Sequence, residues 1–132
     1  FSAAITCSAT SSKVLVHVST FLGGVQNVYL AMILKRNGTE IGSGTGASGS
    51  RTNAFIAGSF QNEGSQPWKI LPASKTFLDS PSSTSALTYQ MYLARSYGSA
   101  GPVNLNASSK YADNQSYIQY MSSTITLMEI GA

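Results

Sequence analysis

The sequence predicts an all-β fold, a sandwich or barrel of about eight to ten short strands. No stretch of ten or more residues combines an apolar repeat of 3.6 residues with a cap, as a helix would. Short apolar or alternating segments recur instead along the whole chain, with Gly, Ser and Asn between them. Many short strands joined by turns are typical of β-sandwiches and barrels.

Nine segments fit the strand pattern, and a short tenth one precedes Pro72. In chain order they span residues 2–7, 13–21, 27–36, 40–46, 51–60, 68–71, 74–79, 87–96, 103–107 and 123–130. Asn37 and Gly38, between the third and fourth segments, are the strongest hairpin signal, because both residues tolerate a positive φ.

Three of these segments are apolar on both faces, which is unusual for a sandwich strand. In 28–34 and 87–94 both alternating sets of residues contain large apolar side chains, and 124–130 shows the same pattern. One face can pack against the other sheet, and the second needs another partner. In a chain this short we expect a second copy of the same chain, because homo-oligomer interfaces are more apolar than ordinary surface. The interface candidates are Tyr29, Ile33, Tyr92, Met128 and Ile130.

The last segment, 123–130, keeps this apolar character almost to the end of the chain. We therefore expect it to be buried within the subunit. Glu129 shares a face with Leu127 by alternation and carries a charge. We expect it near the end of the strand, either in solvent or paired with a basic residue such as Arg95 or Lys35.

Length and composition indicate one globular domain over residues 1–132, with 42% hydrophobic residues. Only 10% of residues are charged, against a usual ~25%, and 22 Ser and 11 Thr take their place. Such surfaces are common in extracellular and virion proteins. The net charge of +3 comes from scattered residues, so no nucleic-acid footprint is present. No apolar run reaches the ~18 residues of a membrane span.

Cys7 is the only cysteine, so no intrachain disulfide can form. We interpret it as a small buried hydrophobic residue, with a reactive thiol as the alternative. The chain starts with Phe1 and has no initiator Met, so we expect a processed product or a fragment of a longer protein.

A family resemblance rests on three motifs in this order: "RNGTEIGSG", "FLDSPSSTSALTY" and "STITLMEI". With "SSKVLVHVS" before them, they resemble the C-terminal domains of tail fibres and other fibrous virion proteins of bacteriophages, marine and cyanophage-like ones especially. The similarity spans essentially the whole chain. It implies a jelly roll similar to the trimeric tumour-necrosis-factor-like fold, in which the last strand lies centrally in the inner sheet beside the threefold axis.

Catalytic patterns are absent. The segment "GTGASG" at 44–49 matches a dinucleotide-binding motif formally, but a strand pattern follows it where a helix is required. His17 is the only histidine, and the five acidic residues are scattered, so we interpret it as a satisfied or interface histidine. Asp79 could face Glu63 or Asp113, as glycoside hydrolysis requires, only by an accident of folding. We expect no enzyme activity, no metal and no cofactor.

Residues 97–120 have the composition of a binding loop, with four Tyr among Ser, Asn and Gly. The same tyrosines could instead pack at a subunit interface or sheet edge. Trp68 is a second contact candidate, with a partly buried core cap as its alternative. The receptor-binding candidates are Tyr97, Asn106, Tyr111, Asn114, Tyr117 and Trp68.

The resemblance, taken with these features, implies a viral fibre tip domain, the C-terminal part of a longer fibrous protein in the virion. It would trimerise the tail or capsid fibre and bind a host-surface receptor, for which a glycan is one candidate. One alternative is a purely structural trimerisation cap or capsid-decorating domain. A second is a secreted lectin-like or cytokine-like module.

Overall fold

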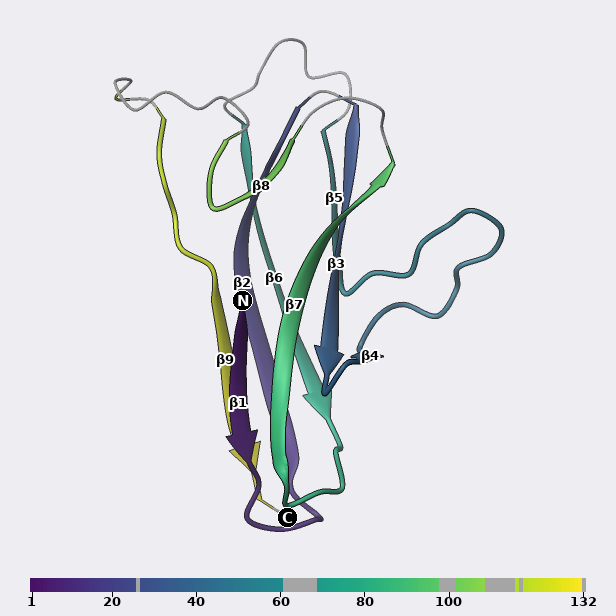
Figure 1. Ribbon diagram of the computed structural model, residues 1–132, viewed down its shortest axis with the longest axis vertical. Coiled ribbons are helices and arrows are strands. Elements are labelled where there is room, and N and C mark those ends of the chain that lie inside the picture. Colours follow the sequence, from purple (N-terminus) through teal and green to yellow (C-terminus); the bar gives the residue numbers. More distant parts are fainter. Residues whose placement is uncertain (26, 61–68, 98–101, 109–115, 117, 132) are drawn as a thin grey trace.

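The computed structural model describes residues 1–25, 27–60, 69–97, 102–108, 116 and 118–131 (Figure 1). This part of the chain is all-β. Its strands are β1 (Ser2–Thr6), β2 (Lys13–Gly24), β3 (Val28–Arg36), β4 (Thr39–Ile41), β5 (Ile56–Phe60), β6 (Ile70–Asp79), β7 (Ala86–Tyr97), β8 (Val103–Leu105) and β9 (Thr124–Ile130). The described residues include no helix with the length and hydropathy needed to span a membrane.

The strands form two antiparallel sheets. In the five-stranded sheet the order is β1-β7-β3-β4, and β5 pairs with β3 beyond the end of β4. In the four-stranded sheet β2 pairs with β6 along one edge and with β9 and then β8 along the other. The all-β expectation is therefore confirmed at the level of two packed antiparallel sheets.

The core lies between these sheets and is built by period-2 alternation. From β2 it takes Val14, Val16, Val18 and Leu22, all fully buried, and from β3 it takes Leu30 and Met32. Cys7 also belongs to this cluster and is 2% exposed, as expected for a small hydrophobic residue. Burial raises the pKa of its thiol, and the nearby charges of Glu129 and Asp79 raise it further.

The predicted hairpin at Asn37 and Gly38 is confirmed. Both residues have positive φ, 47° and 86°, and Arg36 pairs with Thr39 directly across the two-residue turn. This backbone is the one for which Asn-Gly is preferred, because Gly carries no Cβ and Asn tolerates the left-handed region.

Other strand boundaries differ from expectation at the glycine-rich segment. The expected strands 40–46 and 51–60 shrink to β4 and β5, and residues 42–55 between them form a loop that projects from the body (Figure 1). The expected pieces 68–71 and 74–79 instead join into one strand, β6, that continues through Pro72. Proline is tolerated there because, among the described strands, β6 pairs only with β2 and lies at a sheet edge.

The expected central position of the last strand is wrong for this subunit. Along β9 the described residues pair with β2 alone, so β9 is an edge strand of the four-stranded sheet. Its other side lies along β1, the edge of the opposite sheet (Figure 1). Ile125 and Leu127 face the core and are half-buried, whereas Met128 and Ile130 are 53% and 39% exposed.

Candidate binding groove

A groove of about 350 Å³ lies between the projecting 42–55 loop and the outer face of the five-stranded sheet. From the sheet it is lined by Tyr29, Leu30, Ala31 and Ala57. From the loop it is lined by Ser50, Arg51, Thr52 and Ala54. Its volume is at the lower end of the ~300–1,000 Å³ of small-molecule sites.

The base of the loop is fixed by aromatic packing and one lysine. Phe55 is 3% exposed and makes an edge-to-face contact with Phe77 of β6, with ring centroids 6.3 Å apart. Gly42 has φ +66° and packs against both rings, so that a Cβ there would lie only 3.0 Å from Phe55. Lys75 donates to the Gly42 carbonyl at 2.8 Å and lies 4.4 Å from the centre of the Phe55 ring.

Further along, backbone contacts brace the loop against itself and the sheet. The Phe55 amide donates to the Met32 carbonyl of β3 at 2.8 Å. The Ala47 amide donates to Oδ1 of Asn53 at 3.1 Å, and the Gly44 amide donates to the Ala54 carbonyl at 3.3 Å. These bonds join the two limbs of the loop, so Arg51 and its neighbours are presented beside the sheet.

Small side chains make the sheet side of the groove shallow. Ala94 of β7, Ala31 of β3 and Ala57 of β5 lie in one register row across three strands. Ala31 is 3% exposed although it is on the outer face of its sheet. Tyr29 lies one row away and is half-buried. Of these residues Ala31 and Ala57 line the groove, together with Tyr29.

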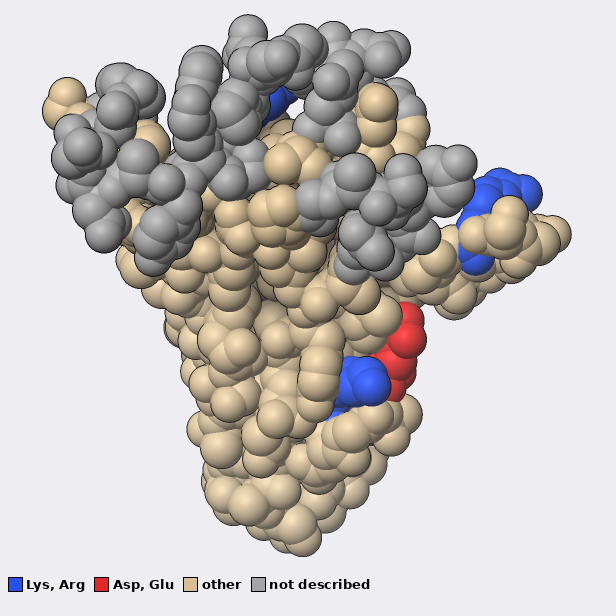
Figure 2. All heavy atoms as spheres, turned by 45° about the horizontal axis from the view of Figure 1, so that its top comes forward, with Lys and Arg blue, Asp and Glu red and all other residues tan. Residues whose placement is uncertain are grey.

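Arg51 is the only basic residue of the loop, and Figure 2 shows basic atoms on this projection. Its side chain is exposed and makes no ion pair with another described residue. None of the eight lining residues is acidic. The groove therefore offers an accessible guanidinium, two hydroxyls and an apolar floor, which suits a small polar ligand with an anionic group.

Most of the receptor-binding candidates lie outside the described residues, namely Tyr111, Asn114, Tyr117 and Trp68; so does the side chain of Tyr97. The described residues that flank these segments lie together at one end of the sheets. Phe60 pairs with Val28, Ile70 pairs with Gly23, and Val103 pairs with Gly24. Receptor binding at this end stays a prediction.

Asn106 is described, and its contacts are internal. Its backbone has φ +68°, and its side-chain Oδ1 accepts from the Ser123 hydroxyl at 2.5 Å. Its backbone amide donates to the Phe21 carbonyl at 2.8 Å. The Met121 amide donates to the Asn106 carbonyl at 2.9 Å. Asn106 thus holds the chain before β9 against the end of β2.

The trimer-interface candidates fall on opposite faces of the molecule. Tyr29, Ile33 and Tyr92 are on the outer face of the five-stranded sheet, whereas Met128 and Ile130 are on that of the four-stranded sheet. On the first face Lys35 lies 4.8 Å from the centre of the Tyr92 ring. Lys35 also pairs in register with Glu40, so this face carries charge as ordinary solvent-exposed surface does.

The outer face of the four-stranded sheet is different. Among the described strand residues on this face, the only charged side chain is Lys13, at the start of β2. The other side chains of this face are apolar or uncharged and polar, among them Leu15, His17, Ser19, Phe21, Pro72, Ser74, Thr76, Leu78, Thr124, Thr126, Met128 and Ile130. Leu78, Leu15 and Met128 form one register row across β6, β2 and β9. Leu78 and Met128, at its two ends, are 47% and 53% exposed. His17 Nδ1 lies 2.9 Å from the Thr76 hydroxyl.

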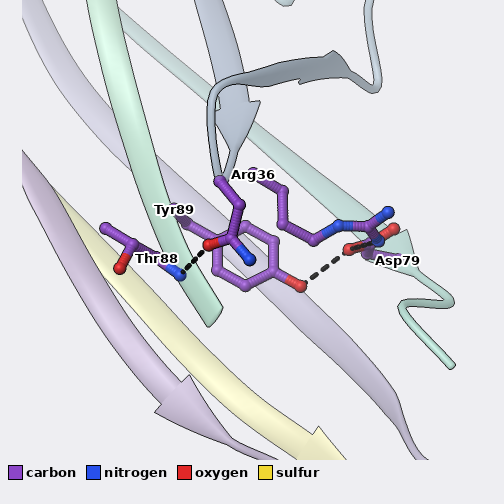
Figure 3. Close-up of polar contacts among 5 residues, drawn as sticks. Arg36, Asp79, Thr88 and Tyr89 are labelled. Carbon is purple, nitrogen blue, oxygen red and sulfur yellow. Dashed lines mark hydrogen bonds and ion pairs between the residues drawn. The ribbon is translucent and has the colours of Figure 1, made fainter. Parts of the chain in front are cut away.

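Asp79 belongs to a buried polar cluster between the sheets (Figure 3). Its Oδ2 accepts from Arg36 at 2.6 Å and from the Tyr89 hydroxyl at 2.7 Å. Burial and the hydrogen bond to Asp79 raise the pKa of Tyr89. Burial acts to lower the pKa of Arg36, but the hydrogen bond and charge of Asp79 outweigh it and raise the pKa. The cluster joins β6 to β3 and β7, which indicates a structural role.

No carboxylate pair for hydrolysis is formed by Asp79 with a described residue, and Glu63 and Asp113 lie outside the described part. Within the same part, no three His, Cys, Asp or Glu side chains gather as a metal site would require. The "GTGASG" segment is in the projecting loop, and the next described element is the strand β5.

Glu129 has a donor partner that the sequence did not suggest. Its Oε1 accepts from both the amide and the hydroxyl of Ser8 at 2.7 Å. Of the two basic residues expected as partners, Lys35 makes no ion pair with it, and the side chain of Arg95 lies outside the described residues. The pKa of Glu129 is lowered by the neighbouring Ser12 hydroxyl and by Ser8. The two Ser8 bonds are well formed, whereas the buried Ser12 hydroxyl has no hydrogen-bond partner among the described residues, so we assign the main effect to Ser8.

The groove was not predicted from the sequence. Its lining comes from two segments about twenty residues apart, and only the return of the loop over β3 brings them together. The available signal was Arg51 within a segment rich in Gly, Ser and Thr.

Comparisons with protein-family models, curated proteins and solved structures found no match for this chain.

Proposed function

We propose that the chain is the tip domain of a viral fibre, a jelly roll that assembles as a homotrimer and binds a host-surface receptor. The observation that carries the assembly part of this proposal is the nearly uncharged outer face of the four-stranded sheet, with Leu78, Met128 and Ile130 exposed on it. The viral-fibre part rests on the resemblance of the three sequence motifs. Interface cores are depleted in charged residues and enriched in apolar ones. Exposed apolar patches rimmed by polar residues mark association sites.

The register row supports a cyclic arrangement. Leu78 on β6 and Met128 on β9 lie at the two edges of the sheet and at the same level along β2. Around a threefold axis beside this face, the β9 side of one copy meets the β6 side of the next. Such a head-to-tail contact closes into a ring, and each copy buries both exposed side chains.

The assembly face is well separated from the loop end, by which we mean the end of the sheets where Phe60, Ile70 and Val103 lie. Leu15 in the apolar row and Gly24 at the loop end are nine residues apart on one strand, about 30 Å at the rise of a β-strand. A trimer built on the apolar row therefore leaves three loop ends accessible. Three weak sites on one head gain avidity without any new contact.

Cysteine cross-linking tests the assembly. In a Cys7→Ala background, Leu78→Cys combined with Met128→Cys should give covalent trimers on oxidation or with a short bismaleimide. Each single variant should remain a monomer on a denaturing gel, because a head-to-tail ring does not bring identical positions together. Ala4→Cys combined with Ser59→Cys is the matched control. It places two exposed cysteines at the edges of the opposite face, and no covalent trimer is expected.

Dimers from Met128→Cys alone would instead indicate a twofold face-to-face contact. The absence of any cross-link, together with a monomeric mass, would refute the assembly. Binding of the labelled native domain to intact host cells tests the adhesive part. A stable trimer that binds no cell of the host range would favour the structural cap over the adhesin.

A further inference from the structure

We propose that the groove between the 42–55 loop and the five-stranded sheet binds an anionic saccharide, a sugar ring that carries a carboxylate or a sulfate. The inference rests on the proposed adhesive function and names the ligand class for it. The carrying observation is the juxtaposition of Arg51, Ser50 and Thr52 on the loop with Tyr29, Ala31 and Ala57 on the sheet around a volume of about 350 Å³.

The size and shape of the groove favour a ligand of one or two rings. A volume near the lower limit of ligand sites excludes an extended cofactor. Ala31 and Ala57 line the sheet side, and Ala57 is exposed, so the apolar face of a ring can lie against it. Tyr29 lines the same side and adds an amphipathic ring.

The polar groups supply the complementary chemistry. Ser50 and Thr52 can each donate and accept, as sugar hydroxyls do. Arg51 lies between them in the sequence, and its planar guanidinium matches the two oxygens of a carboxylate or sulfate. No acidic side chain is among the described residues that line the groove, so none of these would repel an anion. A neutral sugar would leave this cation without a counterpart, so an anionic sugar is the better fit.

The position of the groove agrees with display from an assembly. It lies on the outer face of the five-stranded sheet, whereas the proposed self-association face belongs to the four-stranded sheet on the opposite side of the core. Three copies assembled through the latter face therefore carry three grooves on the outside, where a polymeric glycan can reach more than one.

Two-dimensional NMR titration of the native domain tests the proposal. The probes are glucuronyl-β1,3-N-acetylglucosamine, its methyl ester, and a sulfated galactosaminyl disaccharide with an esterified uronate. We expect either anionic probe, or both, to shift the backbone amides of Ala31, Arg51 and Ala57. The methyl ester, which keeps the rings and loses the charge, should bind at least tenfold more weakly. The comparison of the two anionic probes identifies the preferred group.

Variants locate the site. Arg51→Gln should weaken binding of the anionic probe at least tenfold without a change in melting temperature, because the side chain is exposed. Tyr92→Ala is the matched control on the same face outside the groove, and it should change affinity less than twofold. The proposal would be overturned if neither anionic probe bound, if the anionic probe that binds did so no more tightly than the methyl ester, or if Arg51→Gln had no effect.

Cell binding separates this inference from the proposed function. Native domain that attaches to host cells, together with an Arg51→Gln domain that attaches equally well, would contradict the groove and leave the adhesive function intact. Probe binding at the groove by a domain that attaches to no host cell would support the groove and contradict the adhesive function.

Discussion

Asp79→Ala tests the buried polar cluster that joins the two sheets, and we expect it to lower the stability of the domain markedly. Asp79 is 6% exposed and receives hydrogen bonds from Arg36 of β3 and Tyr89 of β7, so it joins the two sheets at one point. Removal of the carboxylate leaves the Tyr89 hydroxyl without this acceptor at a fully buried position. An unsatisfied buried hydroxyl costs about 1–3 kcal/mol.

The guanidinium adds a smaller amount, because the Arg36 side chain is 25% exposed and can turn towards water. The loss of a charge-assisted hydrogen bond at such a site contributes about 1–2 kcal/mol. We therefore expect Asp79→Ala to lower the free energy of unfolding by about 3 kcal/mol in total. For a domain of this size the melting temperature falls by about 10 °C.

Urea denaturation and calorimetry at one fixed protein concentration measure this loss, since self-association would make both quantities concentration-dependent. Tyr89→Phe removes the hydroxyl without orphaning it and should cost about 1 kcal/mol. Glu40→Ala, an exposed acid on the neighbouring β4, is the control and should stay within about 0.5 kcal/mol of the native protein. An Asp79→Ala loss as small as that of Glu40→Ala would refute the structural role of the cluster.

The pKa of Glu129 is lowered in the folded state, so its stabilising effect is complete above the unfolded pKa and is lost as the pH falls through the folded pKa. Thermal melts from pH 7 to pH 3 should show that Glu129→Gln flattens this decline in stability, and an unchanged profile would contradict the Ser8 contact. Leu127→Asp places a carboxylate on the half-buried inner face of β9 and should cost about 3 kcal/mol or more in urea denaturation, whereas a loss below about 0.5 kcal/mol would contradict the register. Met128→Lys, on the exposed face of the same strand, should instead lower the mass seen by light scattering and leave the circular dichroism spectrum unchanged; retention of the native mass would exclude Met128 from the interface. Exhaustive chelation should leave the melting temperature unchanged, because no metal cluster occurs in the described residues, and a drop of many degrees would reveal a metal site.

Strand positions could be predicted from the sequence where period-2 patterns and turn residues act locally. The Asn37–Gly38 hairpin and the strands β2, β3 and β7 belong to this class, because their signals lie within each segment. The glycine-rich 42–55 loop was misread as strand at both of its ends. Its shape depends on Phe77 and Lys75 of β6, which lie far along the chain and are invisible to local patterns.

Two-sided apolarity led us to expect a second copy of the chain over the second face, and this stays a prediction; the pattern could not tell the two faces apart. The outer face of β3 is partly covered by the chain's own loop, which reduces Ala31 to 3% exposure. The outer face of β9 has no such cover among the described residues, and Met128 remains 53% exposed. Only the fold assigns these residues to opposite sides, since alternation gives the side of a strand and not the sheet that contains it.

Long-range polar partners were equally hidden. Glu129 and Ser8 are 121 residues apart, and Asp79 meets Arg36 and Tyr89 from a different sheet. From the sequence we expected Glu129 either to reach solvent or to pair with a basic residue such as Arg95 or Lys35. A pair of hydrogen bonds from one serine satisfies the carboxylate as well as a cation would, and serine is too common here to be singled out.

The mass of the native domain in solution tests the central claim most directly. Light scattering coupled to size-exclusion chromatography at micromolar concentration should give about three times the 13.9 kDa chain mass, with the same value on tenfold dilution. A species that stays at the mass of one chain at every concentration would contradict assembly through the outer face of the four-stranded sheet.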